Sequence, residues 1–186
     1  IEAARIAVTY RTPVILLSDG YLANGSEPWS LPDVESLPRI EPDFATADPD
    51  TAFLPYARDP QTLARPWAPP GVAGLEHRIG GLEKHHDSGN ISYDADNHHK
   101  MTKVRAAKIA GIADSIPAQK IDKGEDTGDL LVVGWGSTYG AISQAVLGAR
   151  RSGLKVSHIH IRYMNPMPRN LGALLNSQGK HADALA

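Results

Sequence analysis

Histidines and carboxylates gather in one polar stretch of the chain, residues 74–101, which has several glycines and no long apolar run. Imidazole and carboxylate groups are common ligands of zinc and iron. Metal ligands must converge, however, and adjacent histidines in a loop or strand usually point apart; the HExxH spacing is also missing. A segment this polar cannot form a core. We therefore expect hydrogen-bonded residues that line an interface or an active site, and no metal ligand: His85, His86, Asp87, His98 and His99.

A second candidate is the glycine-rich turn Gly134–Gly140, which follows a short apolar run. The amino end of a helix that starts at such a turn can hold an anion, so Gly134, Gly136 and Ser137 are candidates for anion contact. The turn is not a P-loop, because no Gly-Lys-Ser/Thr follows, and its GxGxxxG spacing differs from the dinucleotide fingerprint. The alternative is that these glycines serve only a tight turn and close helix packing.

A third candidate is the loop that begins at Ser18, Asp19 and Gly20 and reaches Asn24. It follows the apolar run Pro13–Leu17, whose uniform character predicts a strand buried on both faces of a parallel sheet. Ligands of α/β proteins usually bind at the carboxyl ends of such strands. We therefore expect these four residues to lie near a cofactor pocket.

The composition narrows the classes of function. With 19 basic and 21 acidic residues among 186, the net charge is −2, which gives no electrostatic case for nucleic acid or an anionic membrane. The chain has no cysteine, so it can form neither a disulfide nor a thiolate-ligated iron–sulfur cluster from its own residues. No apolar run is long enough for a bilayer span. We expect a piece of a longer cytoplasmic protein. No GxSxG elbow or cysteine nucleophile is present, so the catalytic residues are unknown.

The order of elements predicts an α/β chain. A helix is expected over residues 2–10, with Ile6 and Tyr10 on one face, and another near 97–113, capped by Asp94 or Asp96. Lys108 interrupts the apolar stripe of that helix and is expected to be half exposed. A βαβ pattern follows: a strand at 130–133, a helix at 141–149 ended by Gly153, a strand at 155–163, and a further helix from 169.

Between these parts lies a long segment without periodicity. Ten of the 14 prolines fall between residues 24 and 78, which largely excludes helix there. Aromatic residues such as Trp29, Phe44, Phe53, Tyr56 and Trp67 punctuate it. Aromatics at this density favour burial, so we expect an extended segment that lies across the surface of a domain or a subunit. A partly disordered linker is the alternative.

Four motifs together resemble one family. They are PVILLSDGYLANGSEPW, GLEHRIGGLEKHHDSGNISYDADNHHKMTKVRAAKI, GDLLVVGWGSTYGAISQAV and RYMNPMP. In this order they are similar to the α subunits of 2-oxoacid:ferredoxin oxidoreductases, particularly the 2-oxoglutarate type, over roughly residues 5–175. The resemblance implies the end of a thiamine-pyrimidine-binding domain at 1–23, an extended connector at 24–127, and a partial transketolase C-terminal-like domain at 128–186.

The resemblance also implies cofactors and partners. It implies thiamine diphosphate with magnesium and a 4Fe–4S cluster, both mainly on a β subunit, and coenzyme A as co-substrate. The partners would be that β subunit, the remainder of the α subunit, and ferredoxin as electron acceptor. The family's catalytic glutamate and substrate arginine match no residue here. A non-catalytic α/β module that binds an anion or a nucleotide at Gly134–Ser137 is the alternative function.

Overall fold

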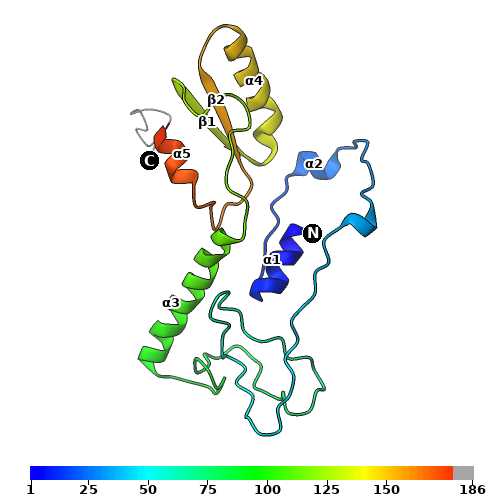
Figure 1. Ribbon diagram of the computed structural model, residues 1–186, viewed down its shortest axis with the longest axis vertical. Coiled ribbons are helices and arrows are strands. Elements are labelled where there is room, and N and C mark those ends of the chain that lie inside the picture. The colour runs from blue at the N-terminus through cyan, green and yellow to red at the C-terminus, as the bar shows by residue number, and fades with distance from the viewer. Residues whose placement is uncertain (178–186) are drawn as a thin grey trace. The chain divides into compact units, whose positions relative to one another are not determined.

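The computed structural model describes residues 1–177, which divide into two compact units. Unit 1 consists of residues 1–16 and 31–112, and unit 2 consists of residues 17–30 and the chain from 113 onward. Figure 1 shows helices in both parts, and the sheet of two strands lies between α4 and α5 in unit 2. The predicted α/β class is confirmed at this level, whereas the three-part domain assignment remains a prediction.

The first helix of unit 1 has the predicted bounds. Helix α1 spans Glu2–Tyr10, and Ile6 and Tyr10 are its buried residues, four positions apart. Glu2 and Arg5 pair across one turn at 2.8 Å. The helix ends where Arg11 adopts a left-handed conformation with φ 44°. The sequence prediction of this helix and its buried face is confirmed.

The long helix of unit 1, α3, spans Ala95–Gly111 and begins at Asp94, whose carboxylate accepts a hydrogen bond from the Asn97 N–H. A short 3₁₀ turn, Ile112–Asp114, follows it. The capping prediction is confirmed, but the expected half exposure of Lys108 is wrong, because its side chain is buried. The Lys108 ammonium donates to the Arg11 carbonyl at 3.1 Å, and this acceptor at the end of α1 allows the burial.

The segment between residue 25 and α3 is mostly irregular, apart from a 3₁₀ turn at Val34–Ser36 and isolated bridges such as Phe44 with Trp67. Trp67 is partly buried and donates from Nε1 to the Val8 carbonyl at 3.0 Å, which ties the segment to α1. Trp29 and Phe44 are exposed within the described chain, so their burial against a domain or subunit surface stays a prediction.

The predicted strand over Pro13–Leu17 is not formed. Residues 12–19 are irregular, and Ile15 and Leu16 are each 83% exposed. A strand needs a neighbour for its backbone N–H and C=O groups, and no segment within residues 1–177 pairs with this one. The apolar run alone therefore does not produce a strand here.

Unit 2 contains the predicted βαβ pattern. Strand β1 spans Leu130–Trp135, a 3₁₀ turn spans Gly136–Thr138, helix α4 spans Tyr139–Arg151, and strand β2 spans Val156–Ile161. The strands are parallel, with Leu130 opposite Val156 and Trp135 opposite Ile161. Gly153 has φ 88° after the last turn of α4, as a C′ glycine should. Short helices α2, Gly20–Asn24, and α5, Leu171–Ser177, complete the unit.

The core of unit 2 lies on the face of the sheet toward α5. It consists of Ile159, Ile161 and Leu171, with partly buried Ile121, Leu131, Val133 and Leu174 packed against them. The α4 side of β2 is more polar, since Ser143 of α4 contacts His158. No helix in the described part of the chain is long and apolar enough to cross a membrane.

Candidate functional site

Two of the predicted site groups meet in unit 2. The Asp19 carboxylate accepts a hydrogen bond from the Ser137 side chain, and this contact is the main reason that the pKa of Asp19 lies below its usual value. The same carboxylate caps α2 by accepting from the Leu22 N–H at 2.9 Å. The loop before α2 is therefore attached to the turn between β1 and α4, although the two are far apart in sequence.

The other residues of the first loop have local roles or face solvent. The Asn24 side chain donates to the Gly20 carbonyl at 2.7 Å, so it closes the single turn of α2. Ser18 is exposed. Within this loop only Asp19 reaches a second candidate group.

Two features of the turn require glycine, namely close packing at Gly134 and a positive φ angle at Gly136. A Cβ atom at Gly134 would lie 2.5 Å from Ile142 Cδ1 and 3.0 Å from Thr138 Oγ1, so helix α4 closes directly against β1. Gly136 has φ 62°, which a glycine adopts without strain. The Thr138 hydroxyl donates to the Trp135 carbonyl at 2.7 Å and tightens the turn.

The Asp19 contact bears on the anion-binding alternative. An anion at the amino end of α4 would be stabilised by free N–H groups and by the helix dipole. Here a carboxylate of the chain itself is bound to Ser137, and its pKa is lowered, so it carries negative charge at neutral pH. A second anion at Ser137 would meet like-charge repulsion, which argues against the binding-module alternative.

Beneath the turn lies a pair of histidines that sequence analysis did not select. His158 and His160 are two residues apart on β2, and both rings contact Tyr139, with centroid distances of 5.6 and 5.0 Å. His158 is fully buried, its Nδ1 lies 3.3 Å from the Ser143 hydroxyl, and burial lowers its pKa. This ring is held neutral and packs the turn from below. An HxH pattern in a predicted strand was the available signal.

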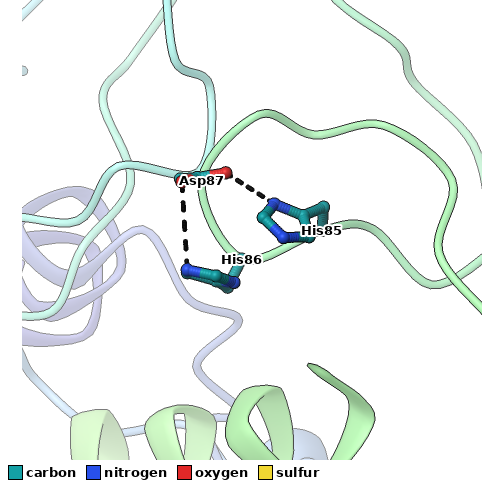
Figure 2. Close-up of side chains that lie close together, drawn as sticks. All are labelled: His85, His86 and Asp87. Atoms are coloured by element: carbon teal, nitrogen blue, oxygen red, sulfur yellow. Dashed lines mark hydrogen bonds and ion pairs between the residues drawn. The ribbon is translucent and has the colours of Figure 1, made fainter. Parts of the chain in front are cut away.

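The polar stretch of unit 1 also gathers its residues. His85 Nδ1 lies 2.5 Å from one oxygen of Asp87, and His86 Nε2 lies 3.8 Å from the other, as Figure 2 shows. The ring centroids of His85 and His86 are 4.2 Å apart. The expectation that adjacent histidines point apart is therefore wrong here. The reason is that Asp87 attracts both rings. One ligand atom from each residue lies within 4.8 Å of the others, which is close enough for a shared cation.

Asn97, which sequence analysis missed, organises this loop. It is buried, its side-chain oxygen accepts from the His86 N–H at 3.0 Å, and its NH₂ group donates to the Lys84 carbonyl at 3.0 Å. Its own N–H is bound by the Asp94 cap of α3 at 2.6 Å. The loop is thus fixed on the first turn of the helix. An amide three residues after a capping aspartate was the only signal in the sequence.

His98 and His99 both lie on α3 but have different surroundings. His98 Nδ1 lies 2.6 Å from Glu83, whose other oxygen accepts from Arg105 at 3.2 Å. Both contacts lower the pKa of Glu83, and the hydrogen bond with His98 has the largest effect. His99 is exposed on α3 and takes no part in this group. Five predicted residues therefore separate into a His85–His86–Asp87 group, a His98–Glu83 hydrogen bond and His99, which is exposed.

The described residues therefore define an α/β segment with two joined loops in unit 2 and, in unit 1, a group of hydrogen-bonded histidines. The chain is 55% identical over 180 residues to the 2-oxoglutarate oxidoreductase subunit KorA of Mycobacterium tuberculosis, covering 97% of this chain and 27% of that protein. It is 31% identical to the 2-oxoacid:ferredoxin oxidoreductase subunit alpha of Saccharolobus solfataricus, covering 91% of this chain and 27% of that protein. No model of a known protein family matches it.

The fold has a matching solved structure. It is a 2-oxoglutarate:ferredoxin oxidoreductase from Magnetococcus marinus with 2-oxoglutarate, coenzyme A and succinyl-CoA bound. The TM-score is 0.77 at 29% identity, and the match covers 88% of this chain and 28% of that one. The chain belongs to the family of 2-oxoacid:ferredoxin oxidoreductase α subunits. It spans 27% of the length of the first two relatives.

Proposed function

We propose that the chain forms part of the α subunit of a 2-oxoglutarate:ferredoxin oxidoreductase. The reaction would be oxidative decarboxylation of 2-oxoglutarate with coenzyme A to succinyl-CoA and carbon dioxide, while two electrons reduce ferredoxin. The observation that carries the proposal is 55% identity that extends over 97% of the chain, so it does not depend on one motif. We place the assembled enzyme in the cytoplasm as part of the same proposal.

The cofactors of this reaction would be held by other chains. Thiamine diphosphate with magnesium would supply the carbanion chemistry and a 4Fe–4S cluster the single-electron steps. The residues here do not fit either group: the chain has no cysteine, the Asp19 carboxylate is bound to Leu22 and Ser137, and the Asn24 amide is bound to Gly20. We propose that a β subunit supplies both, together with the remainder of the α subunit.

Within that assembly we propose structural roles for this chain. The Asp19–Ser137 contact supports a position of Ser18, Asp19, Gly20 and Asn24 beside the cofactor pocket, with Gly134 and Gly136 shaping the adjoining turn. A neighbouring subunit would contact the surface formed by His85, His86, Asp87, His98 and His99. Polar, partly exposed side chains held by a rigid loop suit an interface rim.

The test is coupled activity of the purified assembly. The full α subunit should co-purify with a cysteine-rich partner and reduce ferredoxin only when 2-oxoglutarate and coenzyme A are both present. The 186-residue chain alone should show no such turnover, because it displays no complete catalytic constellation. Ferredoxin reduction with pyruvate but not with 2-oxoglutarate would show that the substrate is pyruvate and contradict the proposed substrate. No 2-oxoacid-dependent reduction by the assembly would contradict the proposed function.

A further inference from the structure

Four cationic side chains gather in unit 1 around the last turns of α3. They are Arg11, Arg58, Arg65 and Lys108. Lys108 is 9% exposed, and its ammonium donates to the Arg11 carbonyl at 3.1 Å. The three arginines are partly buried. The structure therefore holds one buried and three partly buried positive charges close together.

These cations are held by uncharged groups. Arg11 donates to the Pro66 carbonyl and lies over the Trp67 ring at 4.9 Å. Arg58 donates to the Leu63 carbonyl at 2.9 Å. Arg65 lies over the Tyr56 ring at 4.1 Å. Carbonyl and aromatic contacts orient a guanidinium group without neutralising its charge.

The charge in the cluster is not balanced by the described residues. None of the ion pairs found between residues 1 and 177 includes any of the four cations. The hollow that Arg65 lines also contains Glu41, Asp43 and Asp59, and none of these pairs with it. Arg58 Nε is buried and has no hydrogen-bond partner.

Burial and neighbouring positive charges both disfavour the charged form of Lys108. Burial, followed by the charges of Arg58, Arg65 and Arg11, lowers the pKa of Lys108 from 10.5 to about 8. Burial of unpaired charge is costly, and proteins ordinarily compensate buried charges with a partner of opposite sign. The missing component of this cluster is therefore an anion.

We propose that Arg11, Arg58, Arg65 and Lys108 form a binding site for an oxyanion, the phosphate or carboxylate group of a molecule or segment outside residues 1–177. Guanidinium groups present paired N–H donors that match the oxygens of both anions, and an ammonium adds a point charge. The free Arg58 Nε supplies a donor for the anion. The inference rests on the contacts within unit 1 and goes beyond the proposed function.

The first test compares inorganic phosphate and malonate as probes by calorimetric titration of the full chain at pH 7 and constant ionic strength. Wild-type protein should bind at least one of them saturably, and K108M should bind it at least about tenfold more weakly. K103M is the matched control, because Lys103 is an exposed lysine on the same helix and should leave binding unchanged. Preference for phosphate or malonate identifies the group that the site takes. Equal affinity of wild type, K103M and K108M, or no saturable binding of either probe, would overturn the proposal.

A second measurement needs no variant. Acetylation of Lys108 by an amine-reactive ester at pH 8 should slow at least about threefold when the effective anion is added, because an adjacent anion favours the unreactive ammonium form. Lys103 in the same digest serves as the internal control and should react at a constant rate. Equal slowing of both lysines would show general ionic screening and would overturn the proposal.

Discussion

Ser137, at the turn between β1 and α4, hydrogen-bonds the carboxylate of Asp19, which caps α2. This single contact connects two loops that the sequence indicates separately as candidate sites. It also uses the carboxylate that a cation would otherwise bind and the hydroxyl that an anion would otherwise bind. The loop before α2 and the glycine turn therefore form one structural group.

Replacing Ser137 with alanine should raise the pKa of Asp19 toward its ordinary value of about 3.9, because the main cause of its depression is removed. A carboxyl whose pKa is lowered on folding adds stability above its unfolded-state pKa and loses it as the pH falls through the folded value. The contact should therefore contribute at neutral pH, weaken as the pH falls below about 3.9, and be lost below the lower pKa of folded Asp19. A carboxyl carbon NMR titration measures the shift.

The matched control for that titration is S30A, since Ser30 is an exposed serine in the same segment. It should leave the pKa of Asp19 unchanged. The same Asp19 pKa in wild type and S137A would mean that the two loops are not joined in solution.

Replacing Asn97 with alanine should destabilise unit 1 by about 1–3 kcal/mol, because the His86 N–H and the Lys84 carbonyl both lose their buried partner. N90A is the control, since the Asn90 side chain is exposed. Urea denaturation monitored by tryptophan fluorescence measures the difference. Equal midpoints for N97A and N90A would show that the loop is not fixed on α3 by this amide.

Replacing His85 and His98 together with alanine should weaken subunit association, because Asp87 and Glu83 lose the partners that orient them. The metal content of the protein should stay unchanged. Association is measured by sedimentation, and metal by elemental analysis. K103M is the control, as Lys103 is exposed on the same helix as His98 and lies outside the proposed surface. Stoichiometric zinc or iron that is lost in the double variant would assign the His85–His86–Asp87 group to metal binding instead.

Replacing Gly134 with alanine should destabilise unit 2 by about 1–3 kcal/mol, since the new Cβ would lie 2.5 Å from Ile142 Cδ1. G140A provides the opposite comparison, because a Cβ at Gly140 in α4 meets no atom within 4 Å. That change should stabilise the helix by about 0.5–1 kcal/mol. Thermal unfolding gives both values, and a neutral G134A would show that α4 does not close on β1 at this turn.

The sequence by itself determined the local elements whose cause lies within a few residues. Helix α1 follows from its spacing of Ile6 and Tyr10, and α3 from the Asp94 cap. The βαβ order of unit 2 follows from an apolar strand, a glycine turn and the Gly153 stop. The four motifs were also sufficient to indicate the family, which the comparisons confirm.

Tertiary structure decided everything that depends on a distant partner. The apolar run Pro13–Leu17 looks like a buried strand, yet hydrogen bonding to a neighbour makes a strand, and none is present in the described chain. Lys108 is buried because the Arg11 carbonyl meets its ammonium. His85 and His86 converge because Asp87 lies between their ring nitrogens. Local pattern encodes the propensity of a segment, whereas contacts between segments fix which charges and hydrogen bonds are satisfied.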